Sequence, residues 1–265
     1  MTEQEYNEEK GLRSTQIKAL ATGGERALWQ TTFGEKTDTP AMRIGRLCHA
    51  VALLPEEEWS KMFVVSPYDD FRTKEAREWK ATQIANGIDI CTSAEIETAK
   101  KVAEGYKSIA TSCGIAVKHP VEPFANTEVP SITTIGNLAI KARADQLSTD
   151  GGLLIDLKTT SNVMDAENQF WRMRYDLQGG HYANAFKDVV SVAFIFVETS
   201  APFRNAVVLL EGDALDEAKE IALKYANRAS ALLSTYGEKP EYYNACVACV
   251  PATRPAWIVD KYLLD

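Results

Sequence analysis

The chain has 265 residues, of which 45% are hydrophobic and 25% are charged, and its formal net charge is −8. This composition is typical of a globular protein with a well-buried core, and the longest apolar runs, such as 189–197, are too short to span a membrane. The acidic, polar start of the chain lacks the basic and apolar regions of a signal peptide, so we expect a cytoplasmic protein.

The chain contains five cysteines, and an odd number without a secretion signal argues against a framework of disulfides. Cys246 and Cys249 form one Cys-x-x-Cys pair. A zinc or iron–sulfur site would need a second pair or further cysteines nearby. We therefore predict no metal cluster at this pair.

The first half of the chain is predicted to be mainly helical, after a lead-in over 1–12 that we expect to be mobile. Ser14 is a suitable N-cap, and the segment 41–54 is apolar nearly all round, so it should form a buried helix. Helices are predicted from Ser14 with an interruption at Gly23-Gly24, over 41–54 up to Pro55, and over 72–86 and 93–112.

The second half mixes strands and helices. Strands are predicted over 124–134, 138–147, 152–159, 189–197 and 205–211, and helices over 165–187 and 213–235. This order predicts a mixed α/β fold, with helices packed on a central mixed sheet. We find no linker or internal repeat, so we expect a single domain over 1–265.

The strongest chemical signal is a predicted hairpin that carries two aspartates. A two-residue turn at Asp150-Gly151 would place Asp145 directly opposite Asp156, whereas a bulge at Gly152 would shift the register by one. Opposed carboxylates repel each other, and a divalent cation between them would reverse that repulsion. Hard oxygen ligands suit Mg²⁺ or Mn²⁺.

The residues that follow Asp156 add to this predicted metal site. Lys158 shares a strand face with Asp156 and could orient a water or stabilise charge on a phosphate, and the backbone carbonyl of Leu157 could be a further ligand. The alternative is a solvent-exposed hairpin with ordinary charges. The apolar residues around Asp156 favour an interior strand, where charged groups are destabilising unless they are paired.

Two helical pairs complete the set of candidates. His49 lies four residues after Gly45, which would let that helix approach the sheet closely. Gln178 and Tyr182 are also four apart, with Arg174 one turn earlier, and this polar stripe could line a groove for DNA. The alternatives are a hydrogen-bonded core histidine and a solvated helix face. His181 falls off the stripe and is not a candidate.

Taken in order, these motifs resemble the RecB-like branch of the PD-(D/E)XK nuclease superfamily. They are Gly45-x-x-x-His49, Asp145, Asp156-Leu157-Lys158-Thr159-Thr160 and Gln178-x-x-x-Tyr182. Within that branch the chain looks like the C-terminal nuclease domain of the RecE (exonuclease VIII) family. That closer resemblance comes from the segments 14–20, 44–55 and 255–257.

The resemblance implies a restriction-endonuclease-like core and a role for each matching residue. His49, Asp145, Asp156 and the Leu157 carbonyl would hold the metal ion, Lys158 would be catalytic, and Gln178 and Tyr182 would support the site and the DNA. It also implies ATP-independent degradation of duplex DNA from the 5′ end, which leaves a 3′ single strand for recombination.

The resemblance further implies partners. Enzymes of this kind form ring-shaped tetramers with DNA through the middle, and they hand the product strand to a single-strand annealing protein of the RecT type. A ring would reconcile DNA binding with the acidic net charge, because only the channel must be basic. Arg172 and Arg174 are candidates for DNA contact.

Three alternatives stay open. The chain could be a Cas4-like or restriction-type nuclease of the same superfamily, a DNA-binding or assembly module that does not cleave, or a metal-free structural protein. No phosphate-binding loop of the G-x-x-x-x-G-K-[ST] type occurs, so a helicase motor of the RecB type is excluded.

Overall fold

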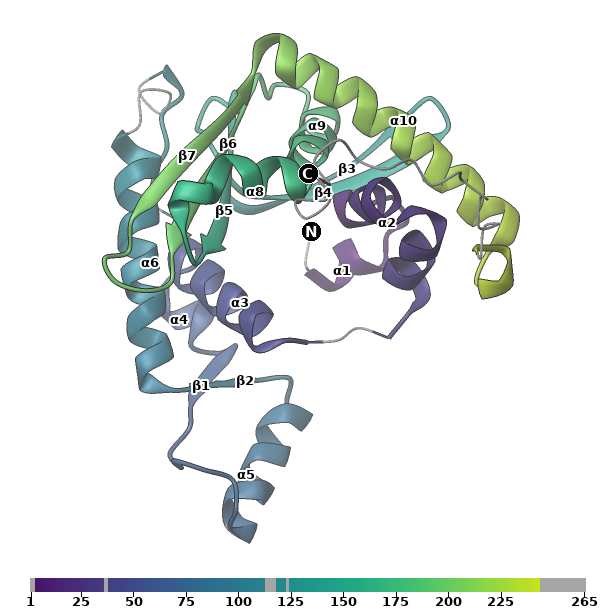
Figure 1. Ribbon diagram of the computed structural model, residues 1–265. Helices are drawn as coiled ribbons and strands as arrows, with labels where there is room; N and C mark the ends of the chain where they lie inside the picture. The colour runs from purple at the N-terminus through teal and green to yellow at the C-terminus, as the bar shows by residue number, and fades with distance from the viewer. Residues whose placement is uncertain (1–2, 36–37, 113–117, 123, 244–265) are drawn as a thin grey trace, which may run out of the picture.

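The computed structural model describes residues 3–35, 38–112, 118–122 and 124–243 (Figure 1). The Cys246 and Cys249 pair and the segment 255–257 lie outside these ranges, so the prediction of no metal cluster and one part of the family resemblance stay predictions.

A five-stranded mixed sheet forms the centre of the molecule, in the order β3-β4-β5-β6-β7. Only β5 and β6 pair in parallel, and the other neighbours are antiparallel. All of β6 is buried, as its continuous apolar sequence predicted. The strands are β3 (Thr127–Ile135), β4 (Leu138–Leu147), β5 (Leu153–Thr160), β6 (Ser191–Glu198) and β7 (Asn205–Glu211).

Helices cover both faces of this sheet (Figure 1). On one face lie α2 (Ser14–Phe33), α9 (Tyr175–Ala185) and α10 (Gly212–Tyr236), and α8 (Ala166–Arg172) packs near β7. On the other face lie α3 (Pro40–Leu53) and α6 (Ser93–Ser112). Side chains therefore alternate along β5 between two hydrophobic clusters, with Leu154 in the first and Leu153, Ile155 and Leu157 in the second.

A small arm extends from the main body on the side of α3 (Figure 1). It comprises α4 (Glu56–Trp59), the parallel strands β1 (Phe63–Val65) and β2 (Asp89–Cys91), and α5 (Lys74–Ala85). Tyr68 and Phe71 pack on Trp79, which gives the arm its own aromatic cluster. No helix in the described ranges is both long and apolar enough to pass through a bilayer.

The predicted mixed α/β fold is confirmed, and most predicted segments are present. The segment 165–187 is an exception, because it forms two helices and not one. Arg174 has a left-handed backbone (φ 52°) between α8 and α9. A non-glycine residue rarely adopts this conformation, so periodicity alone does not reveal the break.

Three smaller predictions about the first half need correction. From Glu3 on, the lead-in packs as α1 (Glu3–Glu8), and the ammonium of Lys141 donates to its carbonyl oxygens. The first helix is capped at Arg13 and not at Ser14, and only Gly24 of the glycine pair leaves the helical conformation. The helix over 41–54 is buried only in its second half, from Leu47 on.

Candidate active site

The two aspartates of the hairpin meet where β4 and β5 separate. The strands pair at Gln146–Ile155 and Leu147–Leu154, and the same register places Asp145 opposite Asp156, as the turn predicted. Beyond this point, the Leu157 backbone N–H donates to Asp145 Oδ2 at 2.8 Å. The carboxylate of Asp145 thus accepts a hydrogen bond that a backbone carbonyl of the neighbouring strand would otherwise accept, and it lies between the two strands.

A break in the side-chain alternation of β4 gives Asp145 this position. Ala142 and Ala144 pack in the same hydrophobic cluster as Leu147. Residues 144 and 147 can share a face only if the alternation is broken between them. Asp145 lies at this break, so its neighbours come from both layers of helices. The sequence had instead predicted that both aspartates lie on one face of the sheet.

Asp156 is held from the α9 side. Its Oδ2 accepts hydrogen bonds from Gln178 Nε2 (2.7 Å) and from the Tyr182 hydroxyl (2.9 Å). Its Oδ1 contacts the ammonium of Lys158, and the side chain is only 2% exposed. One oxygen of this carboxylate is therefore held by α9, and the other is paired with the charged Lys158.

His49 reaches Asp145 from α3, on the other side of the sheet. Its Nδ1 lies 3.3 Å from Asp145 Oδ2, and it makes a hydrogen bond with the Leu157 backbone. Burial is the main cause that lowers the pKa of His49, and the charge of Lys158 lowers it further. The imidazole is therefore neutral at neutral pH. A neutral imidazole is the form that binds metal ions.

The charged groups of the site shift one another's pKa values. Burial, and after it the charge of Asp156, raises the pKa of Asp145 to about 8. Burial alone would lower the pKa of Lys158, but Asp156, Tyr175 and Asp145 outweigh it and raise that pKa. At neutral pH the lysine is therefore charged, while Asp145 is largely protonated.

These donors fit a divalent cation by their chemistry. One imidazole nitrogen, two carboxylates and the backbone of Leu157 meet at one place. Within the described residues, no three His, Cys, Asp or Glu side chains are grouped tightly enough to hold an ion as they stand. Binding would require Lys158 to move away from Asp156 Oδ1, which it now contacts.

Of the remaining candidates, some lie at the site and others do not. Arg174 pairs with Asp176 at 3.0 Å, so the stripe predicted for the groove reduces to Gln178 and Tyr182, which are buried against Asp156. His181 is buried and its Nε2 contacts the Lys141 carbonyl oxygen, in keeping with its exclusion from the candidates. A Cβ on Gly45 would lie 3.7 Å from Thr159, which is ordinary contact, so close packing does not require this glycine.

Residues 13–251 match the family described as a PDDEXK-like domain of unknown function, DUF3799. This match spans most of the chain. The chain belongs to the DUF3799 family. Its fold is accordingly that of the PD-(D/E)XK superfamily, as the motifs predicted, while membership in the RecE family is not shown by this match. A comparison with curated proteins found no match.

Two solved structures were found to be similar to this chain, and the first of them has the same fold. A suspected exonuclease from Eubacterium rectale aligns with 90% of this DUF3799 chain and 87% of its own, at a TM-score of 0.58 and 13% identity. A phage-related exonuclease from Haemophilus somnus covers 71% of the chain and 94% of its own, at a TM-score of 0.34 and 16% identity. At this identity the first relative supports the fold alone.

The DUF3799 site also contains a residue that sequence reasoning missed. Lys18 of α2 donates a hydrogen bond to Gln178 Oε1 at 2.6 Å, so α2 contributes to the site across the sheet face. The only signal was its place in the segment 14–20 that carried the family resemblance. Nothing in that segment by itself indicated a partner 160 residues away.

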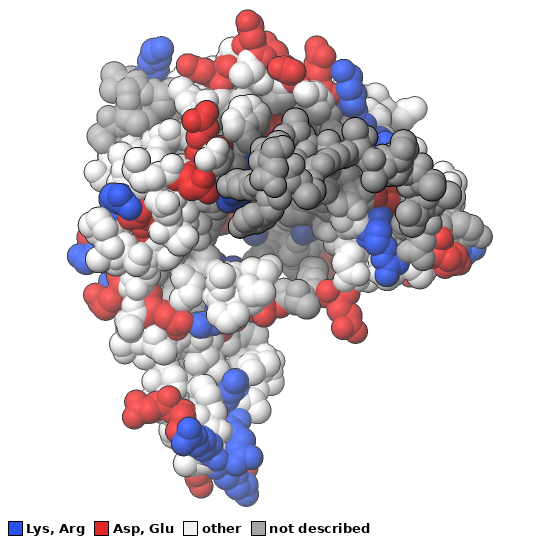
Figure 2. Space-filling view, viewed as in Figure 1, with Lys and Arg blue, Asp and Glu red and all other residues white. Residues whose placement is uncertain are grey.

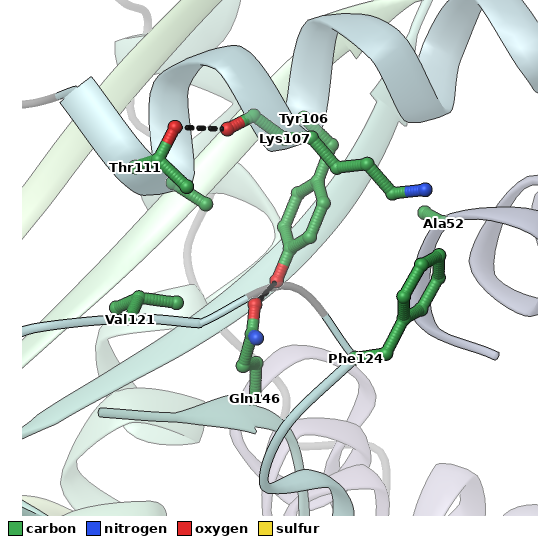
Figure 3. A pocket seen from close by; sticks show the side chains of 8 residues that line it. Ala52, Tyr106, Lys107, Thr111, Val121, Phe124 and Gln146 are labelled. Carbon is green, nitrogen blue, oxygen red and sulfur yellow. Dashed lines mark hydrogen bonds between the residues drawn. The ribbon is translucent and has the colours of Figure 1, made fainter. Parts of the chain in front are cut away.

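A hydrogen-bond network on the α6 side supports the strand next to Asp145. The Tyr106 hydroxyl donates to Gln146 Oε1 at 2.8 Å, and Gln146 Nε2 donates to the carbonyl oxygens of Glu122 and Ala125. Figure 3 shows this pair at the side of a small pocket, with Phe124 beside Lys107. The network satisfies the buried amide of Gln146 and so fixes β4 where Asp145 begins.

A groove with a mixed polar and apolar lining lies at the carboxyl end of β5. Thr159 and Thr160 line it together with Ile44 of α3 and with Arg172 of α8. Thr159 and Thr160 follow Lys158 on β5, so the groove begins at the strand end that carries the candidate catalytic lysine. Arg172, predicted as a DNA contact, is exposed there and pairs with Asp165 at 3.2 Å.

Proposed function

We propose that this chain is a deoxyribonuclease that hydrolyses phosphodiester bonds with the help of Mg²⁺ or Mn²⁺. The observation that carries the proposal is the meeting of His49, Asp145, Asp156 and Lys158 in one place, from three different elements. Two buried carboxylates beside a lysine are unfavourable in a purely structural site, because one of them stays protonated at neutral pH.

Each side chain has a defined part in this proposal. Gln178 and Tyr182 hold Asp156 Oδ2, so that Oδ1 faces the site. His49 and Asp145 offer a nitrogen and an oxygen on the opposite side. A bound divalent ion would lower the pKa of a water and polarise the phosphate. Lys158 keeps its charge and would stabilise the negative charge that develops on the phosphate oxygens.

The groove at the end of β5 is the proposed path of the substrate strand. Its lining includes hydroxyl and amide groups such as those of Ser161, Asn162 and Gln169, which suit the phosphate and sugar of DNA, beside apolar side chains and Asp165. Figure 2 shows acidic and basic side chains mixed over the face in view, with Lys and Arg gathered most densely at the tip of the arm, over α5. The net charge of −8 therefore does not describe every part of the surface.

The finer proposal is an ATP-independent exonuclease that digests duplex DNA from the 5′ end and leaves 3′ single strands for recombination by strand annealing. Its support is the resemblance of the ordered motifs to the RecE family. A homotetrameric ring around the DNA and a partner of the RecT type belong to the same proposal. Light scattering of the purified protein tests the ring, since a monomeric mass would contradict it.

The decisive experiment for the activity uses linear duplex DNA labelled at one 5′ end or at one 3′ end. With Mg²⁺ and no ATP, the wild type should release the 5′ label early and the 3′ label late. An Asp156→Asn variant should leave both labels in place. If the wild type degrades neither substrate, the nuclease proposal is wrong, and DNA binding without cleavage would identify a binding module.

A second substrate separates the exonuclease from the nearest alternative. Covalently closed circular duplex has no ends, so an exonuclease should leave it intact under the same conditions. Cleavage of the circle would instead identify an endonuclease of the Cas4-like or restriction type.

A further inference from the structure

A second lysine shares the aromatic ring that lies under Lys158. Lys18 Nζ lies 4.8 Å from the centroid of the Tyr175 ring, and Lys158 Nζ lies 4.7 Å from the same centroid. The two ammonium groups come from α2 and β5, and they meet only because the fold packs these elements around the start of α9. Two cations on one ring form a local concentration of positive charge.

The contacts of Lys18 differ from those of the other site lysine. Lys158 contacts the carboxylate of Asp156, whereas Lys18 donates to the neutral amide oxygen of Gln178. Among the described residues, no carboxylate lies within ion-pair distance of Lys18. Burial, and after it the charge of Lys158, lowers the pKa of Lys18 to about 7. Lys18 is therefore only partly protonated at neutral pH, and an anion beside it would raise this pKa and favour the charged form.

We infer that Lys18 is a phosphate-binding residue that, beside Lys158, contacts a phosphodiester group of the bound nucleic acid. This inference rests on the proposed function. A phosphodiester has two non-bridging oxygens, so two ammonium groups from different elements can each donate to one of them. The hydrogen bond to Gln178 and the Tyr175 ring hold the Lys18 ammonium in place before the substrate arrives, and a half-buried side chain stays accessible to it.

A purely structural account of Lys18 makes a different prediction. Because Lys18 occupies Oε1 of Gln178, it directs Nε2 of the same amide toward Asp156 Oδ2. If that were its whole role, removal of the ammonium would disturb Asp156 and slow hydrolysis, but it would leave the electrostatic part of DNA binding unchanged.

The test is the salt dependence of DNA binding by the full chain. Binding of a 5′-phosphorylated, fluorescent duplex is measured by anisotropy in Ca²⁺, over a series of KCl concentrations. Loss of one phosphate contact lowers the slope of log K against log salt by about 0.9 for duplex DNA. We expect this decrease for Lys18→Met, together with weaker binding at low salt, and we expect Lys18→Arg to keep the wild-type slope.

The matched control is Lys224→Met on α10, an exposed lysine that pairs with Glu220. It should leave the slope and the affinity unchanged. Removal of a half-buried charge should not lower the melting temperature of Lys18→Met, so the variant is expected to fold. An unchanged slope in a folded Lys18→Met protein would overturn the inference, even if hydrolysis became slower.

The two proposals fail in different ways. A wild type that cleaves DNA, with a Lys18→Met slope equal to its own, would refute only the role of Lys18. A wild type that binds DNA and loses one unit of slope in Lys18→Met, but never cleaves, would refute only the nuclease.

Discussion

The two faces of β5 hold the two aspartates in different ways. On the α9 face, Asp156 is fixed by Gln178 and Tyr182, and its side chain is 2% exposed. On the α3 face, Asp145 meets one backbone N–H and a histidine that is 29% exposed. The α9 face is therefore preorganised, while the α3 face offers fewer hydrogen bonds and has a carboxyl group whose pKa is raised by burial.

This difference assigns different roles to the two carboxylates. Asp156 should anchor the metal ion and set its position, because its second oxygen is already fixed. Asp145 should respond to the ion, because a cation would bring its raised pKa back toward the ordinary range. The predictions below test the difference, starting with the largest expected effect.

Asp156→Asn should abolish most of the activity. The substitution keeps the shape and removes the charge from the best-held ligand, so we expect kcat to fall by about 100- to 1000-fold or more. Single-turnover digestion of linear duplex measures this effect. A melting temperature close to that of the wild type is the control for folding, and activity within a factor of two of wild type would contradict the account.

Tyr182→Phe should have an intermediate effect. It removes one of the two hydrogen bonds to Asp156 Oδ2 but keeps the ring, which is buried among α9 contacts. Groups that orient a metal ligand typically contribute 10- to 100-fold in affinity or rate, so we expect a loss of about 10-fold. Titration of activity against Mn²⁺ concentration reports it. An unchanged dependence on Mn²⁺ would contradict the role of this hydrogen bond in holding Asp156.

Asp145 should make the metal-free protein less stable as the pH rises. Its folded pKa of about 8 is above the ordinary value of 3.8, so the folded state holds a proton that the unfolded state has released. This contribution to stability is complete below pH 4 and is lost as the pH rises through 8. The melting temperature should fall more steeply in the wild type than in Asp145→Asn between pH 5.5 and 8.5, and Mg²⁺ should reduce that fall.

His49 and Lys18 act in the opposite direction, because burial lowers the pKa of both. Their contribution is shared by the wild type and Asp145→Asn, so the difference between the two curves isolates Asp145. Parallel curves would show that Asp145 is ionised in the folded state, contrary to the account of the α3 face.

The smallest effects concern two glycines, one from each face. A Cβ on Gly180 of α9 would lie 2.2 Å from the Ala218 carbonyl oxygen, whereas a Cβ on Gly45 of α3 meets only Thr159 at 3.7 Å. Gly180→Ala should therefore destabilise the fold by about 1 to 3 kcal/mol. Gly45→Ala should be neutral or stabilising by up to about 1 kcal/mol. Urea unfolding of the two variants measures both changes, and equal effects would mean that the two faces pack alike.

Sequence patterns predicted the fold well because its main signals are local. Alternation and apolar spacing marked the strands and most helices, and the turn at Asp150-Gly151 was enough to fix the register of β4 and β5. The same turn placed Asp145 opposite Asp156, which is the basis of the site. Local geometry was therefore enough to predict the strand register and the position of the two aspartates.

What the sequence did not predict depends on contacts between distant segments. Lys18 reaches Gln178 because α2 packs near α9, and Lys141 holds α1 by donating to the carbonyl oxygens of Tyr6 and Asn7. The break in alternation at Asp145 and the left-handed Arg174 leave no periodic signal. Such features follow from tertiary packing, which local propensity does not encode.

The central claim is that Asp145 and Asp156 share a divalent cation, and calorimetry with Mn²⁺ tests it most directly, without DNA and without catalysis. We expect the wild type and the Lys224→Met control to bind Mn²⁺ with the same affinity. Asp156→Asn should lose most of this affinity, and Asp145→Asn should lose at least about 10-fold. No heat of binding in the folded wild type, or equal affinity in all four proteins, would contradict the account.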